Sequence, residues 1–99
     1  MYARISRISG AAENSDQGVA SFKETTLPEV RSLSGNRGSI LLIDRASGDA
    51  MAITLWNDEE AMQASDERAN QLRSEASEQM GAEGHARVER YEVAVLEMM

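Results

Sequence analysis

The stretch Gly38–Asn57 constrains the fold of this chain more than any other part of the sequence. Two apolar runs of β-favouring residues flank a short polar segment at Ser47-Gly48-Asp49. This is the pattern of a β-hairpin with a loop of a few residues. A loop over Ala46–Asp49 predicts a register in which Leu42 pairs with Ile53.

Both faces of this hairpin are expected to be buried. A sheet with one solvated face alternates apolar and polar residues, and the two runs do not. Something must therefore cover each side. In the predicted register one face carries Ile40, Leu42, Met51, Ile53 and Leu55, and the other carries Leu41, Ile43, Ala52, Thr54 and Trp56.

The segment before the hairpin predicts a strand and a helix. Tyr2–Ile8 contains apolar residues and few breakers, which favours a strand. The spacing of Asn14 and Gln17 is that of a capping box, so a helix is expected to begin there. Pro28 cannot continue an unbroken helix, because it lacks the N–H and clashes with the preceding turn. The helix is therefore expected to break and to restart with Thr26 as its cap.

The segment after the hairpin predicts a second helix and a last strand. Asn57 and Glu60 form another capping box, and acids favour the positive end of the helix dipole. Glycines at 81 and 84 are expected to end this helix. The run Ala86–Leu96 alternates, as a strand does. The inward face of the helix is expected to carry Ala61, Met62, Ser65, Ala69, Leu72, Ala76 and Met80.

This order of elements predicts an α+β fold. Strand–helix–strand occurs twice, which gives a ferredoxin-like βαββαβ protomer with a four-stranded antiparallel sheet and both helices on one face. Residues 1–99 are expected to form a single domain. The helices cover one face only, so the second apolar face is expected to pack on a second copy of the sheet in a homodimer.

Composition excludes several classes of partner. The net charge is −7, with Lys23 as the one lysine and nine scattered arginines, so neither nucleic acid nor an anionic membrane is an expected partner. There is no cysteine, which excludes disulfides and thiolate chemistry. The N-terminus lacks a signal-peptide core and no apolar run is long enough to span a membrane. The sequence therefore predicts a cytoplasmic protein.

A resemblance to a known family sharpens these expectations. Leu42–Arg45, followed by Thr54–Met62 and later by Val88–Val93, resembles the antibiotic biosynthesis monooxygenase (ABM) domains of the dimeric α+β-barrel superfamily. The resemblance covers nearly the whole chain in element order. Its most specific part is Trp56 at a strand end, followed by an acidic helix start and Ala61.

The resemblance implies a dimeric α+β barrel with a pocket between each sheet and its helices. Characterised relatives include oxygenases that oxidise phenolic polyketides without metal or flavin, and haem-degrading enzymes. Others isomerise, decarboxylate or have no known activity. Many oxygenase-like members carry a histidine where this chain has Ser65, and this departure argues against haem ligation from that helix.

A cofactor-free monooxygenase of this kind needs a dry cavity with hydrogen-bond donors, because the substrate supplies the electron as a phenolate or enolate. Neither a cofactor nor a metal is expected, and the ligand is expected to be a small aromatic, enolisable or apolar molecule. The candidate catalytic residues are Trp56, Asn57 and Tyr91. The candidate substrate-binding residues are Ala52, Thr54, Ser65, Leu72 and Arg90.

Each candidate also has a structural interpretation. Trp56 fits a core position, Asn57 a plain N-cap and Tyr91 a packing position. His85, the one histidine, lies in a predicted loop, where histidines are usually solvated. Two hypotheses therefore stand: an ABM-like oxygenase, or a non-catalytic dimer that binds a small ligand or has a structural role. RNA-recognition domains share this element order, but this chain lacks their positive charge and the stacking aromatics of their middle strands.

Overall fold

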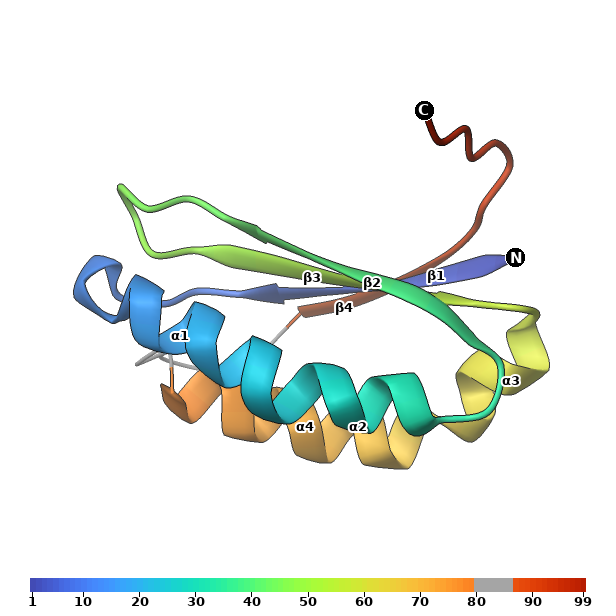
Figure 1. Cartoon of the computed structure of the whole chain (residues 1–99), viewed down its shortest axis with the longest axis horizontal. Coiled ribbons are helices and arrows are strands. Elements are labelled where there is room, and N and C mark those ends of the chain that lie inside the picture. Colours follow the sequence, from blue (N-terminus) through green and yellow to red (C-terminus); the bar gives the residue numbers. More distant parts are fainter. Residues whose placement is uncertain (80–86) are drawn as a thin grey trace.

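A four-stranded antiparallel sheet carries all of the described helices on one face (Figure 1). The computed structural model describes residues 1–79 and 87–99, the side chains of residues 76–79 excepted. The strand order is β2-β3-β1-β4. This arrangement confirms the predicted ferredoxin-like α+β fold. The strands are β1 (Tyr2–Ile8), β2 (Asn36–Ile43), β3 (Ala50–Trp56) and β4 (Arg87–Glu92).

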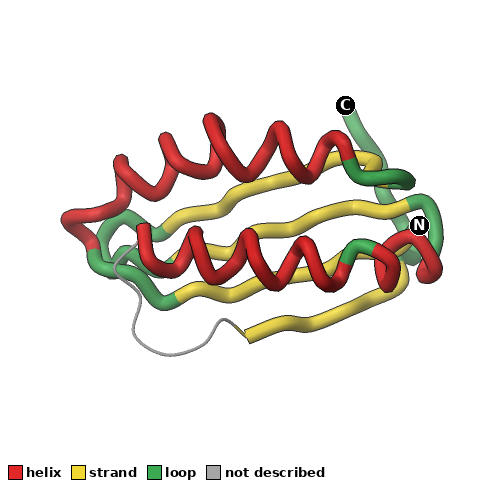
Figure 2. Tube along the Cα trace, turned by 90° about the horizontal axis from the view of Figure 1, so that it is seen from below, coloured by secondary structure: helices red, strands yellow, loops and turns green. Residues whose placement is uncertain are grey.

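The helices lie across the sheet in two rows (Figure 2). One row consists of a short 3₁₀ turn, α1, a π turn and α2, and the other contains α4 with α3 at one end. The first row fills the connection between β1 and β2, and the second row follows β3. The bounds are Ala12–Asn14 for the 3₁₀ turn, Ser15–Ser21 for α1, Phe22–Thr26 for the π turn, Leu27–Ser32 for α2, Glu59–Ala64 for α3 and Asp66–Gln79 for α4.

The hairpin forms, but its register differs from the prediction. Leu42 pairs with Met51 rather than with Ile53, a shift of two residues. The cause is a longer loop: the carboxylate of Asp44 accepts the Ala46 backbone N–H at 2.9 Å, and Asp44 and Asp49 close the loop through their backbones. Because a two-residue shift preserves the side-chain faces, the predicted division of the hairpin into two faces is unchanged.

The geometry of the loop also requires a glycine at position 48. Its φ is +85°, in the left-handed region that favours glycine. A Cβ at this position would lie 2.3 Å from the carbonyl carbon of Ala11, in the connection that follows β1. The tip of the hairpin therefore packs directly on the backbone that leads into the first helix.

The first helical row is continuous, so the predicted break at Pro28 is wrong. Pro28 lies in the first turn of α2, where a missing N–H is tolerated. Just before it, the Leu27 N–H donates to the carbonyl of Phe22, five residues back, in the π turn. Thr26 is helical rather than a cap. The capping box expected at Asn14 is also wrong, because Asn14 makes no side-chain cap hydrogen bond.

The second row begins one residue later than predicted. Asp58, not Asn57, is the N-cap of α3, and its carboxylate accepts the Ala61 N–H at 2.8 Å. The row breaks at Ser65, which separates α3 from α4. The hydroxyl of Ser65 donates to the carbonyl of Met62 at 2.7 Å and satisfies a carbonyl at the end of α3. The predicted helix end at the glycines 81 and 84 lies outside the described residues.

The last strand is shorter than predicted. β4 ends at Glu92, and the Val93 N–H then donates to the Met1 carbonyl at 2.9 Å. Beyond this point the chain leaves the sheet (Figure 1), and Val95 and Met98 are exposed. The strand predicted to extend to Leu96 therefore ends at Glu92, which pairs with Tyr2, the first residue of β1.

The core lies between the sheet and the helices. Val30, Trp56, Met62 and Leu72 form its largest cluster. The opposite face of the sheet is uncovered within the chain, and Ile40 and Leu42 are 45% and 49% exposed there. Among the described residues, none of the helices has the length and apolar character needed to cross a bilayer.

Candidate functional site

A small cavity lies between the sheet and the helices, at the side of Trp56. Its volume is about 50 Å³. About 10–15 Å³ suffices for one water molecule, so the cavity has room for about three to five waters or a ligand of a few heavy atoms. Its lining is almost wholly apolar. Strand β3 contributes Ala52, Thr54 and Trp56, and the helices contribute residues that include Phe22, Val30 and Leu72.

Four of the predicted site residues meet at this cavity. Ala52, Thr54 and Trp56 alternate along β3 and so point to the helix side, while Leu72 reaches the same space from α4. The indole N–H of Trp56 donates to the hydroxyl of Thr54 at 3.0 Å, so this N–H is already partnered. Trp56 therefore supplies the cavity with an aromatic wall rather than with a free donor.

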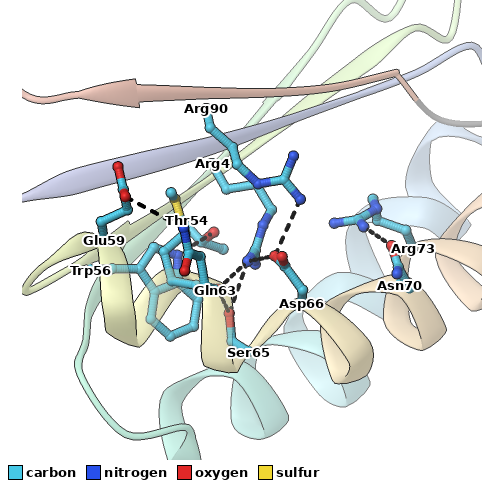
Figure 3. Close-up of polar contacts among 11 residues, drawn as sticks. Arg4, Thr54, Trp56, Glu59, Gln63, Ser65, Asp66, Asn70, Arg73 and Arg90 are labelled. Atoms are coloured by element: carbon cyan, nitrogen blue, oxygen red, sulfur yellow. Dashed lines mark hydrogen bonds and ion pairs between the residues drawn. The ribbon is translucent and has the colours of Figure 1, made fainter.

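Arg4 is a charged lining residue that sequence reasoning did not single out. It lies on β1, its pairing partner on β3 is Thr54, and it is only 2% exposed. One terminal nitrogen donates to the carbonyl of Met62, to the hydroxyl of Ser65 at 2.9 Å, and to Asp66 (Figure 3). This nitrogen joins the first strand to the junction between α3 and α4.

The Nε–H of the Arg4 guanidinium, unlike its terminal nitrogen, makes no hydrogen bond. The Nε atom is buried. The Cζ atom lies 5.5 Å from the centroid of the Trp56 ring, within the range of a cation–π contact. Burial lowers the pKa of Arg4, which the charge of Asp66 partly offsets. An arginine nevertheless stays protonated in proteins, so the cavity has a charged donor in its wall.

Two further arginines surround this charge. Arg90 on β4 donates to Asp66 at 3.2 Å. Arg73 on α4 is half-buried, lines the cavity and donates to Asn70, a neutral partner. Burial lowers the pKa of Arg73, and the positive charges of Arg4 and Arg90 lower it further. Among the described residues, Asp66 is the one carboxylate paired with this cluster of three arginines, in a chain with a net charge of −7.

The remaining predicted residues lie outside the cavity. Ser65 and Arg90 contact it only through Arg4 and Asp66. Asn57 is exposed and accepts a hydrogen bond from Arg37 at 3.2 Å. Tyr91 lies on the outer face of the sheet, is 52% exposed and donates to Glu89 at 2.8 Å.

The chemistry of the lining is limited. None of the described residues that line the cavity is a carboxylate or a histidine, so the lining includes no general base. Among the described residues, no group of three or more His, Cys, Asp or Glu side chains is placed to hold a metal ion. His85, a candidate base, lies outside the described residues. A haem is far larger than 50 Å³ and finds no histidine here, so these residues do not fit it.

The fold is that of the antibiotic biosynthesis monooxygenase (ABM)-like domains, which confirms the predicted resemblance at the level of structure. A Streptomyces coelicolor monooxygenase from the gene ActVA-Orf6, solved with the ligand nanaomycin D, superposes with a TM-score of 0.75 at 14% identity, over 98% of this chain and 92% of that chain. The haem-degrader MhuD of Mycobacterium tuberculosis, solved with two hemes in its active site, gives a TM-score of 0.76 at 21% identity, over 99% and 100% of the two chains.

Sequence comparison gives closer relatives. The Mycobacterium tuberculosis proteins Rv2557 and Rv2558, both described as uncharacterized, are 34% and 35% identical over 96 residues, which is 97% of this chain. This chain spans about two-fifths of their length, 42% and 40% respectively. No protein-family model matches the chain.

Proposed function

We propose that this chain binds a small planar ligand, aromatic or enolisable, in the cavity beside Trp56, and that it oxygenates this ligand without a bound cofactor. The observation that carries the proposal is a partly open, almost wholly apolar cavity whose lining includes Arg4, a residue with one buried, unpartnered N–H. In a dry site such a donor stabilises negative charge that develops on an oxygen of the substrate.

The chemistry follows from what the lining lacks. With no carboxylate or histidine among the described lining residues, the substrate has to arrive as an anion or lose its proton to solvent. An enolate or phenolate can transfer one electron to O₂, and the resulting radical can combine with superoxide to give a peroxide. Loss of water then yields a carbonyl, so that a CH₂ group and O₂ become C=O and H₂O.

Trp56 provides the assay, because it is the one tryptophan of the chain and lies in the cavity wall. We would titrate the protein with small phenols and 1,3-diketones, follow the fluorescence, and measure O₂ uptake in chelator-treated buffer. With ¹⁸O₂, the product should gain one labelled oxygen. In Ala52→Phe, which fills the cavity, both signals should disappear. Unchanged binding in this variant would refute the proposed pocket.

A non-catalytic binding protein is the second candidate function, and the absence of a base among the described lining residues favours it. The fluorescence titration and the oxygen electrode separate the two functions. Saturable binding without O₂ uptake for any ligand of the panel would identify a binding protein.

We further propose that residues 1–99 act as one domain and form a homodimer through the uncovered face of the sheet. Ile40 and Leu42 of β2 are nearly half exposed on this face. Met51, Ile53 and Leu55 of the neighbouring strand β3 lie beside them on the same face. An apolar strip of this kind is rarely left in water. No nucleic-acid or membrane partner is proposed, and the cytoplasmic location stays a prediction from the sequence.

A further inference from the structure

We infer that the ligand of this cavity is a small planar monoanion, a carboxylate or an enolate, and that Arg4 recognises it through its Nε–H. The inference rests on the proposed ligand pocket and adds the charge of the ligand and the side chain that selects it. It depends on three observations: the unused donor, the local excess of positive charge, and the shape of the space.

The unused donor is the first observation. A buried N–H without a partner destabilises the folded protein, and native proteins leave few such groups. The hydrogen bonds from Arg4 to the α3–α4 junction do not involve Nε, because a terminal nitrogen makes the contacts with Met62, Ser65 and Asp66. The donor that remains lies in a residue that lines the cavity. An acceptor on a ligand would satisfy it.

The excess of positive charge is the second observation. Asp66 is shared by Arg4 and Arg90, so it neutralises one charge of the pair. Arg73 lines the same cavity and has a neutral hydrogen-bond partner, Asn70. A buried charge needs a counter-charge, and an anionic ligand supplies one. A neutral ligand of the same shape would leave this cluster uncompensated.

The shape of the space is the third observation. The cavity volume of about 50 Å³ suits an anion of a few heavy atoms, and a ring-sized ligand requires lining side chains such as Phe22 or Leu72 to move. The Trp56 ring provides a flat wall beside the guanidinium. A planar acceptor can therefore meet Nε with one oxygen and place its apolar part toward Ala52.

The test compares isosteres that differ in charge. Acetate is titrated against acetamide, and benzoate against benzamide, at constant ionic strength, with Trp56 fluorescence as the signal. Hydrogen bonds to charged groups contribute about 1.5–3 kcal/mol, so the anion of each pair should bind about 10- to 100-fold more tightly than the amide. Acetylacetone, titrated below and above its own pKa, separates an enolate preference from a carboxylate preference.

Variants assign the preference to the residues. Arg4→Lys retains a cation that can contact Ser65 and Asp66 but lacks the Nε–H, so its preference for the anion over the amide should be smaller than in the wild type. If Arg4→Lys does not fold, Arg73→Met, which changes a residue outside the α3–α4 junction, should weaken anion binding and leave amide binding unchanged. Arg37→Met is the matched control, because Arg37 is exposed and contacts Asn57 away from the cavity.

The outcomes distinguish the two proposals. Anion and amide binding equally to the wild-type protein would overturn the anion inference and leave the ligand pocket intact. No binding of any of these probes would overturn both. An anion preference that survives undiminished in Arg4→Lys and in Arg73→Met alike would overturn the assignment to this cluster.

Discussion

Arg4 and Trp56 are diagonal neighbours on adjacent strands, and the guanidinium of one lies over the ring of the other at 5.5 Å. Strand pairing causes this contact, because Tyr2 pairs with Trp56 and Arg4 with Thr54, all on the helix side of the sheet. A desolvated contact of this kind contributes about 2 kcal/mol. A change in the charge or position of Arg4 is therefore expected to alter the fluorescence of Trp56.

Removing Arg4 should destabilise the fold. Arg4→Met removes the arginine N–H groups from Met62 and Ser65, while the Met62 carbonyl keeps the Ser65 hydroxyl and Asp66 keeps Arg90 as a partner. The expected loss in the free energy of unfolding is about 1–3 kcal/mol, measured by urea denaturation. Arg37→Met at the surface should change it by less than about 0.5 kcal/mol. Equal stability of Arg4→Met and wild type would show that this network is dispensable.

Enlarging the cavity should strengthen its binding of a ring, because the lining side chains then need not move. Leu72→Ala removes a buried lining side chain, and we expect it to lower stability by about 2–4 kcal/mol and to let benzene or phenol raise the Tm. Met62→Ala is the matched control, because Met62 is equally buried but does not line the cavity. A ligand-induced rise in Tm of the same size in both variants would contradict the location of the cavity.

The start of α3 can be tested with two neighbouring residues. Asp58→Ala removes the side chain that accepts the Ala61 N–H and should cost about 1 kcal/mol. Asn57→Ala removes a side chain that is exposed and bonded only to Arg37, so it should be nearly neutral. Thermal unfolding of the two variants measures the difference. The reverse order of stabilities would restore Asn57 as the cap.

Acid should weaken the fold partly through Asp66. Burial acts to raise the pKa of Asp66, but the hydrogen bond from Arg90 and the charges of Arg4 and Arg90 outweigh it, so the pKa is lowered. A carboxyl group with a lowered folded-state pKa stabilises the fold fully above its unfolded pKa, and this stabilisation is lost as the pH falls through the folded pKa.

The stability contributed by Asp66 should therefore be constant down to about pH 5 and decline below about pH 4. In Asp66→Asn the decline should be shallower, although the variant is less stable at neutral pH. Urea denaturation across this pH range provides the measurement. Glu67→Gln, which changes an exposed acid on the same helix, is the control variant. Identical acid profiles for Asp66→Asn and wild type would rule out this contribution.

The uncovered face of the sheet predicts dimerisation. Leu42→Lys places a charge in the centre of the apolar strip and should shift the protein to a monomer in light scattering. Ala20→Lys, exposed on α1 on the opposite side of the sheet, should leave the dimer unchanged. A wild-type protein that is monomeric at ordinary concentrations would remove the basis for the proposed dimer.

Much of the fold was predictable, because the spacing of apolar residues in a short segment shows whether it is a strand or a helix and which of its faces is buried. The two apolar runs of the hairpin indicated its faces, and these survived a two-residue change of register. The register itself was not predictable, because the Asp44 side chain reorganises the loop. Pro28 was misjudged because a π turn, which leaves no mark in the hydrophobic pattern, accommodates it.

From the sequence, only the apolar wall of the candidate site could be predicted. Trp56, Ala52 and Thr54 alternate on one strand, so one correct face places all three. Arg90 and Tyr91 are adjacent in a strand and cannot both point toward the helices, so naming both as site residues contained a contradiction. Arg4 was missed because a charged residue is expected to face solvent. The signal for its burial was the alternation back from Ile8, visible once β1 pairs with β3.

The reach of the Arg4 contacts has a consequence for the synthesis of the protein. Its acceptors at Met62, Ser65 and Asp66 lie 58, 61 and 62 residues further along the chain. On a translating ribosome, β1 therefore emerges long before any group that can receive its arginine. We expect nascent chains that end before Asp66 to leave β1 without these partners, so that the domain folds late, when α4 and β4 have left the exit tunnel.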